Sequence, residues 1–260
     1  MPALEVRLLD EPACLPAVAS LFDAVWPASG GYAPDLLRAI SHAGGYVAGA
    51  FREPDLLGAS FGFLGRSGDA LVLHSHVTGV RPGVEHAGVG LALKHHQRNW
   101  ARANGLVAIT WTFDPLVRRN AWFNLGKLGA GVTAYAENFY GTLTDAINRD
   151  DETDRLIVWW STELDTGPDP SRDRVAIGPV EGFEVVDPGG SLHDPLPDEP
   201  VLLAWTPPDL VGLRRRDPDT ATRWRHALRA GVGGSMARGY LVSGFTRDGC
   251  YVLQRAEVGS

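Results

Sequence analysis

A pair of glycines at the start of a helical pattern is the clearest chemical signal in this sequence. Residues 71–80 form an apolar, strand-like segment, and Arg81-Pro82 and a short loop lead from it to Gly88-Val89-Gly90. Backbone N–H groups point outward at a helix N-terminus, and glycines let a phosphate approach them closely. The pattern therefore predicts an anion site. A Gly-x-Gly alone is weak evidence, because the chain lacks the Gly-Lys-Ser/Thr of a P-loop and the full dinucleotide-binding fingerprint.

Other residue types with chemical potential form no comparable pattern. Ser75 lies between two histidines but lacks the Gly-x-Ser-x-Gly elbow of a serine nucleophile. His95 and His96 are adjacent on a predicted helix, where side chains point about 100° apart and do not easily share an ion. Cys14 and Cys250 lie near opposite ends of the chain, and we expect both to stay reduced. We therefore expect no metal site.

The composition indicates a chain with a substantial core. The 260 residues are 44% hydrophobic and 21% charged, which excludes a disordered protein. A net charge of −7 argues against a nucleic-acid partner, which would need a basic face. The longest apolar runs are too short to cross a bilayer, and the first ten residues have no signal-peptide core. We expect a cytoplasmic protein with no membrane partner.

The elements that must position the glycines are a mixture of strands and helices. Period-two patterns predict the strands, and patterns of period 3.6 with stop signals predict the helices. Asp114-Pro115 has the residue types of a helix start, with Asp as the cap. The predicted strands cover residues 4–9, 46–51, 57–64, 71–80, 106–113, 131–135 and 156–160; the predicted helices cover 12–26, 34–42 and 88–104 and a segment that starts at 114.

The last hundred residues differ in composition from the rest. Residues 161–200 hold ten acidic and two basic residues, and residues 201–260 hold five acidic and nine basic ones, so we expect the basic part to pack near the acidic part. After a short strand at 183–186, the pattern predicts a strand, a helix and a hairpin, which bury too little surface to fold alone. These later elements cover residues 201–205, 217–230, 240–245 and 251–255. The predicted organisation is therefore a domain at 1–164, a connector at 165–200 and an extension at 201–260. We expect the extension to pack on the core or on a second subunit.

The segment around the glycines resembles the GNAT acyltransferase superfamily. Its pattern is a strand that ends in Val-x-Pro, followed by Gln/Arg-x-x-Gly-x-Gly/Ala at the start of a helix. Here the residues are Val80-Arg81-Pro82 and Glu85-His86-Ala87-Gly88-Val89-Gly90, and the order of elements over 4–160 also matches. Further segments are similar to a bacterial branch of GNAT acyltransferases with a C-terminal extension. Some relatives in that branch are associated with N-succinylation of amino acids. The similar segments are residues 74–80, 110–115, 120–121, 127–129, 138–141, 154–156 and 224–225.

The resemblance implies both a fold and a co-substrate. The fold is α/β, with a mixed central sheet flanked by helices and a small C-terminal strand–helix–hairpin extension. The co-substrate is acetyl-CoA or another acyl-CoA, whose pantetheine arm pairs with the end of the fourth strand while the pyrophosphate binds loop amides. The implied cofactor-binding residues are Thr78, Gly79, Val80, His86, Ala87, Gly88, Val89, Gly90 and Asn120.

One residue departs from the family pattern. Glu85 stands where Gln or Arg is usual, and a carboxylate there repels a phosphate unless it points away. Because backbone amides supply most of the grip, we expect weaker binding rather than none. Arg81, His86 or Lys94 are candidates for restoring positive charge, and Glu85 as a solvated loop residue is the alternative interpretation.

The resemblance also implies direct attack of an amine on the thioester. An ammonium substrate must first lose a proton, and an imidazole has a suitable pKa to accept it. His74 is the first candidate for the base, because related histone-type acetyltransferases carry a Glu base at the matching offset, and His76 is the second. The strand period predicts that both lie on one face together with Thr78 and Val80. The alternative is that both are polar residues of a half-exposed strand.

The remaining site candidates follow the fifth predicted strand. Many GNAT proteins carry a general-acid tyrosine on the next helix, and since none falls there in this chain, Tyr140 and Tyr135 are the substitutes. Asp114 is a candidate for binding the substrate ammonium, although we favour its role as a helix cap. Trp111 is a second candidate contact for the acceptor.

The resemblance implies a CoA-dependent N-acyltransferase that moves an acetyl or succinyl group to the amine of a small molecule, such as an amino acid. A non-catalytic protein that binds or senses acyl-CoA is the alternative, favoured by Glu85 and by the missing helix tyrosine. Acylation of protein lysines is a further possibility, which the net charge does not oppose. Because GNAT proteins are often dimers, we expect a homodimer.

Overall fold

The computed structural model describes residues 3–27, 31–85, 87–141, 152–163 and 180–255. It contains a mixed sheet of seven strands in the order β1-β2-β3-β4-β5-β7-β6 and a sheet of four strands in the order β10-β11-β9-β8. The strands of the first sheet are β1 (Glu5–Leu8), β2 (Tyr46–Arg52), β3 (Asp55–Ser67), β4 (Ala70–Val80), β5 (Ala108–Phe113), β6 (Gly131–Ala136) and β7 (Arg155–Ser161). Those of the second are β8 (Phe183–Val186), β9 (Val201–Trp205), β10 (Tyr240–Phe245) and β11 (Cys250–Arg255). Every predicted strand is present, within a few residues of the predicted bounds.

The chain divides into two compact units, and each is described by itself. The first comprises residues 1–111 and 160–165, and the second comprises 112–159 and 166–260. The strands β5 and β7 each pass from one unit to the other. The three-part organisation with boundaries after 164 and 200 stays a prediction.

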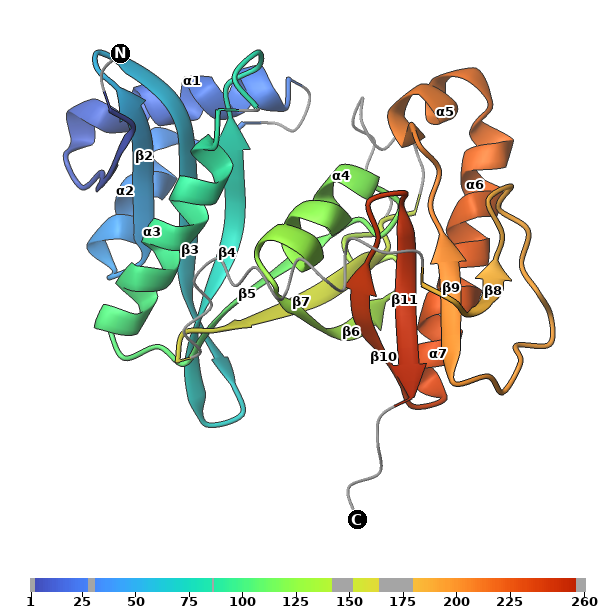
Figure 1. The fold of residues 1–260 in the computed structure, drawn as a ribbon. Coiled ribbons are helices and arrows are strands. Elements are labelled where there is room, and N and C mark those ends of the chain that lie inside the picture. Colours follow the sequence, from blue (N-terminus) through green and yellow to red (C-terminus); the bar gives the residue numbers. More distant parts are fainter. Residues whose placement is uncertain (1–2, 28–30, 86, 142–151, 164–179, 256–260) are drawn as a thin grey trace. The chain divides into compact units, whose positions relative to one another are not determined.

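In the first unit, helices cover both faces of β2–β4 (Figure 1). On one face Phe22 meets Phe61 of β3, with 5.9 Å between ring centroids. On the other face Val89 and Leu93 pack with Leu57. The helices of the first face are α1 (Leu15–Val25), which follows the short 3-10 helix η1 (Pro12–Cys14), and α2 (Pro34–His42), and the helix of the second face is α3 (Val89–Ala103).

Strand β4 contains an extra residue that reverses the facing of its last residues. Phe61 of β3 pairs with Val77, whereas Gly62 pairs with Ser75, so His76 has no opposite residue and forms a β-bulge. His76 lies beside Phe61 on the α1 face, with 5.4 Å between ring centroids. After the bulge, Thr78 lies on the α3 face. We expected His74, His76, Thr78 and Val80 to share one face of the strand. This expectation is wrong, because the bulge at His76 reverses the alternation of the residues that follow it.

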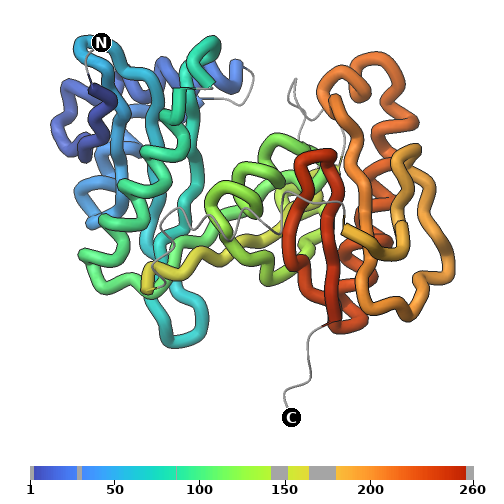
Figure 2. Tube along the Cα trace, viewed as in Figure 1, coloured from blue at the N-terminus to red at the C-terminus, as the bar shows by residue number. Residues whose placement is uncertain are grey.

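In the second unit, a helical segment packs against the C-terminal sheet, whose hairpin β10–β11 forms the red end of the trace in Figure 2. The side chain of Asp217 accepts the N–H of Thr220 at 3.0 Å and caps α6, which begins within one residue of the predicted start. Gly231 fits against Val186 of β8, since an added Cβ would lie 2.5 Å from that side chain. The helical elements are α5 (Leu210–Arg216), α6 (Pro218–Leu228), the π-helical η4 (Arg229–Gly233) and α7 (Gly234–Ala237).

The helix after β5 begins later than predicted. Asp114 accepts the N–H of Leu116 at 2.9 Å in a turn, and α4 (Arg118–Ala121) starts only after it, continuing into the π-helical η2 (Trp122–Lys127). The helix cap predicted at Asp114 is therefore wrong. No helix among the described residues is both long and apolar enough to span a membrane.

Candidate functional site

The pairing of β4 with β5 ends early, within the first unit. The two strands run parallel and pair at Val72↔Ala108, Leu73↔Ile109 and His74↔Thr110, although β4 continues for six residues to Val80. We call the end of this pairing, at His74 and Thr110, the fork. Beyond the fork the backbone of β4 presents N–H and C=O groups along its β5 side, which is the arrangement that an added extended chain can pair with.

The loop that follows β4 leads to an open backbone turn at Gly88. This residue has φ +75° and precedes the first residue of α3, and an added Cβ would meet no atom within 4 Å. The amides of the first turn, from Val89 to Leu91, lack intrahelical acceptors, as in any helix, and so remain available to an anion. Among the predicted loop amides, that of Ala87 donates to the carbonyl of Val84 at 3.0 Å, and His86 lies outside the described residues.

The charged residues near this turn are engaged elsewhere. The carboxylate of Glu85 accepts the N–H of Gly83 at 2.9 Å. The guanidinium of Arg81 donates to the carbonyl of Leu56 and lies 3.7 Å from the carboxylate of Asp55. These contacts lie within the loop and with the start of β3, and the amides at the N-terminus of α3 are the donors that the turn offers to an anion.

His74 and His76 lie side by side at the fork. Their ring centroids are 6.2 Å apart, and Nδ1 of His74 is 3.3 Å from the hydroxyl of Thr110. Burial, followed by the charges of His76 and Lys94, lowers the pKa of His74 below its ordinary value, and burial also lowers that of His76. Both rings are therefore more readily neutral near pH 7 than a free imidazole, as a proton acceptor must be.

Thr78, Gly79 and Val80 use their side-chain positions for packing. The hydroxyl of Thr78 is 2.9 Å from that of Ser60, Val80 packs beside the Val89–Leu93 cluster, and a Cβ on Gly79 would lie 3.1 Å from Phe22. Only their backbone edge remains for a ligand. Their implied role, in which pantetheine pairs with the main chain, stays a prediction.

A buried polar network on the α3 face was missed by sequence reasoning. Lys94 is 4% exposed, and its Nζ donates to Ser75 Oγ at 2.8 Å and to Gln97 Oε1 at 3.3 Å. Gln97 in turn donates to Ser60 at 3.3 Å. The Lys94 Nζ also lies 4.0 Å from the ring centroid of Trp111, which is 5% exposed. Trp111 thus has a core environment, which favours packing over the predicted acceptor contact.

Asp114 lies in a buried ion-pair network of the second unit. Arg225 donates to both of its carboxylate oxygens, at 2.7 and 2.9 Å, and Arg214 donates to one at 3.0 Å. Burial alone would raise the pKa of Asp114, but the charge and hydrogen bonds of Arg225 and the charge of Arg214 outweigh it and hold that pKa at about 2. A carboxylate already neutralised in this way favours a structural role over the predicted binding of an ammonium.

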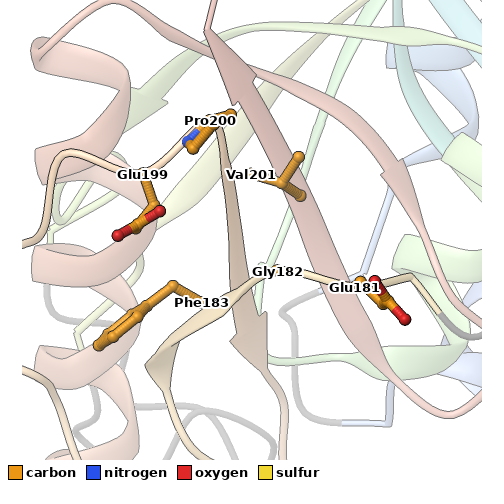
Figure 3. Close-up of a pocket in the computed structure, with 6 residues that line it drawn as sticks. All are labelled: Glu181, Gly182, Phe183, Glu199, Pro200 and Val201. Atoms are coloured by element: carbon orange, nitrogen blue, oxygen red, sulfur yellow. The ribbon is translucent and has the colours of Figure 1, made fainter.

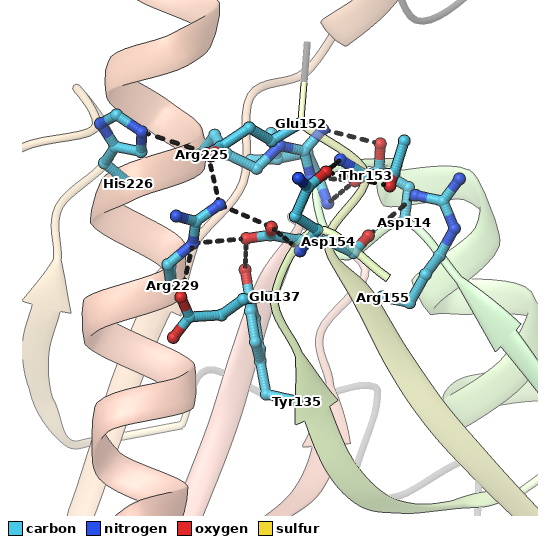
Figure 4. A network of polar contacts seen from close by, with 12 residues as sticks. Asp114, Tyr135, Glu137, Glu152, Thr153, Asp154, Arg155, Arg225, His226 and Arg229 are labelled. Atoms are coloured by element: carbon cyan, nitrogen blue, oxygen red, sulfur yellow. Dashed lines mark hydrogen bonds and ion pairs between the residues drawn. The ribbon is translucent and has the colours of Figure 1, made fainter. Parts of the chain in front are cut away.

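A second carboxylate of the same unit is held similarly (Figure 4). Asp154 accepts from Arg229 at 2.6 Å and from the hydroxyl of Tyr135 at 2.7 Å. Tyr135, one of the two substitutes for a general acid, is thereby committed to Asp154. Arg225 is fully buried, and Arg229 pairs with Asp154, so both arginines belong to this network. In line with the predicted charge pairing, Arg238 and Arg255 each contact Asp198.

Two further predicted residues lie in the second unit. Tyr140 is 41% exposed, its hydroxyl is 3.3 Å from that of Thr112, and the guanidinium of Arg155 lies 5.2 Å from its ring centroid. Asn120 is half-buried in α4. Their roles in acid catalysis and pantetheine contact stay predictions.

A shallow hollow of the second unit lies between the starts of β8 and β9, and Figure 3 shows its lining. Glu181, Gly182 and Phe183 form one side, and residues 199–201 form the other. Its two carboxylates are exposed, and it contains none of the predicted site residues.

Comparison with solved structures identifies the fold of this chain. No protein-family model and no curated protein matches the sequence. yncA of Salmonella typhimurium, assigned as an acetyltransferase and solved with its cofactor acetyl-CoA, is 16% identical with a TM-score of 0.51, over 64% of this chain and 98% of its own. An N-acetyltransferase of Staphylococcus aureus Mu50 is 12% identical with a TM-score of 0.51, over 62% and 99%. The ribosomal-protein-S5-alanine acetyltransferase of Vibrio fischeri is 14% identical with a TM-score of 0.50, over 63% and 95%.

At these identities the likeness is one of fold. The chain has the GNAT fold, an α/β architecture with a mixed seven-stranded sheet flanked by helices and a second small sheet at the C-terminal end.

Proposed function

We propose that this protein is a CoA-dependent N-acyltransferase that moves an acetyl or succinyl group to the amine of a small molecule such as an amino acid. The observation that carries the proposal is the fork, which leaves the edge of β4 open beside the Gly88 turn in the same compact unit. When bound, acyl-CoA supplies a thioester already activated for attack by an amine. GNAT-fold structures solved as acetyltransferases support this interpretation.

The residues present fit such a co-substrate. The main chain of residues 75–80 offers hydrogen bonds to the amide groups of a pantetheine arm. The amides of Val89 and Gly90 would hold the pyrophosphate, and the missing Cβ at Gly88 leaves the space that it needs. The N–H of Ala87 is already bonded to the carbonyl of Val84, so fewer amides can bind the pyrophosphate than the predicted set of loop amides. The carboxylate of Glu85 is held by the N–H of Gly83 in the same loop.

His74 is placed to receive the proton that the amine loses. In the tautomer that carries its proton on Nδ1, this N–H donates to the Thr110 hydroxyl, and Nε2 keeps a lone pair to accept the proton of the amine. The lowered pKa keeps the ring neutral near pH 7, and His76 beside it is the second candidate. The acceptor amine, the homodimer and the contribution of Tyr140 belong to the same proposal.

A non-catalytic protein that binds acyl-CoA is the second candidate function. The carboxylate of Glu85 beside the anion turn favours it, since binding would then be weak and reversible. Both candidates require the same fork and turn, and they differ in whether an amine is acylated.

The test combines binding with turnover. Calorimetry with CoA, acetyl-CoA and succinyl-CoA is expected to show binding of at least one, and the absence of binding of all three would contradict both candidates. Release of free thiol with a panel of amino acids and small amines is expected above the rate without amine. Binding without amine-dependent thiol release would favour the non-catalytic function. Mass spectrometry of a metabolite pool incubated with the enzyme and each acyl-CoA would then identify the product.

A further inference from the structure

Lys94 brings an amine to the fork from the face opposite the histidines. Its Nζ is 2.8 Å from Ser75 Oγ and 4.0 Å from the ring centroid of Trp111. Ser75 directly follows His74 in β4, and Trp111 directly follows Thr110 in β5. The amine therefore lies beside the first residue of each strand after their pairing ends. An acyl group carried along the edge of β4 toward the fork would end next to it.

The surroundings of this amine are neutral. Its hydrogen-bond partners are a hydroxyl and an amide oxygen, and across the described ranges no carboxylate pairs with it. Burial lowers the pKa of Lys94 to about 7, so a large part of the population has a free lone pair at neutral pH. Desolvation of this kind is one of the ways in which proteins make a lysine nucleophilic.

We propose that Lys94 is itself an acyl acceptor, a modification site that the protein fills from acyl-CoA bound at its own fork. The inference rests on the proposed function, because the thioester must bind there first. The lone pair of Nζ attacks the thioester carbonyl carbon and forms a C–N bond. The C–S bond breaks, its electron pair goes to sulfur, and the proton lost by nitrogen goes to the same sulfur. The products are N-acyl-lysine and free CoA thiol.

The modification has a structural consequence. An acylated Lys94 has no charge and only one N–H, so it cannot donate to both Ser75 and Gln97. The buried network would lose one of its hydrogen bonds next to the acyl-binding edge. We expect the acylated protein to bind a further acyl-CoA more weakly.

The chain contains its own control, because Lys127 is the only other lysine and it is exposed. A reagent that reacts from solution, such as acetic anhydride or acetyl phosphate, should modify Lys127 first. Acylation directed by a bound thioester should favour Lys94, which is 4% exposed. The ratio of the two sites therefore distinguishes a templated reaction from a random one.

The experiment incubates the full chain with acetyl-CoA at neutral pH and follows both lysine-containing peptides by mass spectrometry. We expect the acetyl mass on Lys94 in about tenfold or greater excess over Lys127, as positioning of the thioester provides. Excess CoA and the Gly88→Glu substitution should each abolish the Lys94 signal and leave that of Lys127. Lys94→Met should remove the signal, and calorimetry should show CoA binding that is weakened, as expected for the acylated protein, but not lost.

The outcomes separate this inference from the proposed function. Acetylation confined to Lys127, with CoA binding intact by calorimetry, overturns the inference and leaves the proposed function standing. A Lys94 signal that excess CoA does not reduce also overturns it, since the reaction is then not directed by the site. A failure of CoA, acetyl-CoA and succinyl-CoA all to bind removes the proposed function and the inference with it.

Discussion

At the scale of single residues, His74 carries the proposed proton transfer. We expect His74→Asn to lower the rate of amine acylation about 10²-fold, the usual contribution of a general base. Because the amine loses its proton unaided at high pH, the deficit should shrink there. In the wild type, activity should fall on acidification through a pKa below the ordinary histidine value, since burial and the charges of His76 and Lys94 lower it. Rate measurements over pH check both expectations.

The matched control is His42→Asn, which changes an exposed histidine at the end of α2. It should leave the rate and the pH profile unchanged. If His74→Asn keeps the wild-type turnover and pH profile, His74 is only a residue of the strand. If His76→Asn then loses most of its activity, His76 is the general base.

Lys94 makes a separate prediction about stability. Its pKa is about 7 when folded and near 10.4 in an unfolded chain, so the unfolded chain binds more protons between these values. The free energy of unfolding should therefore gain a contribution that rises as pH increases from about 7 to about 10. We expect Lys94→Met to lack this rise, as measured by urea unfolding at several pH values. Lys127→Met should keep it, and a rise of equal size in Lys94→Met would contradict the assignment.

At the residue scale, the sequence allows candidates to be chosen where the chemistry is visible in a short pattern, and it does not reveal contacts between residues that are distant in sequence. The glycines and histidines stand in short patterns. Lys94 and Gln97 belong to the buried face of α3, but a search for apolar periodicity passes over them, since their partners Ser60 and Ser75 are distant in sequence. A lysine and a glutamine three residues apart, in register with Val89 and Leu93, were the available signal.

At the scale of elements, the turn before α3 decides CoA binding. We expect Gly88→Glu to reduce CoA affinity at least about tenfold, because a side chain and a like charge would enter the space intended for the pyrophosphate. The fold should survive, since an added Cβ meets no atom within 4 Å. Calorimetry with CoA measures the loss.

Gly88→Ala is the control for backbone strain. At φ +75° any Cβ costs about 1 kcal/mol, so both variants share this cost, but only glutamate adds the charge. The alanine variant should therefore keep most of the affinity. An unchanged affinity in a folded Gly88→Glu protein would remove the anion site from this turn.

The elements themselves were largely predictable, and their irregularities were not. Alternating patterns identify β3 and β4, but the bulge at His76 depends on how β3 pairs with β4 and has no local signature. The helix start at Asp114-Pro115 has the right residue types, yet the Asp114 carboxylate accepts the N–H of Leu116 in a turn and pairs with Arg225, and α4 begins later. Tertiary contacts overrode local preference in both cases.

At the scale of the whole molecule, buried ion pairs join distant parts of the second unit. Asp114→Asn would remove the carboxylate that accepts two hydrogen bonds from the fully buried Arg225, and we expect a loss of about 3–5 kcal/mol in the free energy of unfolding. Asp209→Asn, at the exposed start of α5, should cost about 1 kcal/mol or less. Urea unfolding measures both, and equal effects would contradict the role of the buried pair.

The same pair gives a pH dependence with a defined sign. The pKa of Asp114 is about 2 when folded, below the ordinary aspartate value of about 3.9. Its contribution is therefore fully present above about pH 4 and is lost as pH falls toward 2. The difference in stability between wild type and Asp114→Asn should shrink over this range, as acid unfolding of both proteins would show.

Truncation after Leu164 tests whether the C-terminal segment is part of the fold. It removes Arg225 and Arg229, so Asp114 and Asp154, which are 8% and 0% exposed, lose their main charge partners. A buried carboxylate without a charge partner strongly destabilises the folded state. We expect the truncated chain to be insoluble or molten, without cooperative unfolding and without tight CoA binding. Replacing both aspartates by asparagine in the truncated chain should recover solubility in part, because the charge cost is removed but the packing against the helical segment is not restored. A truncated chain that unfolds cooperatively at the parent temperature and binds CoA with parent affinity would make the segment an appendage.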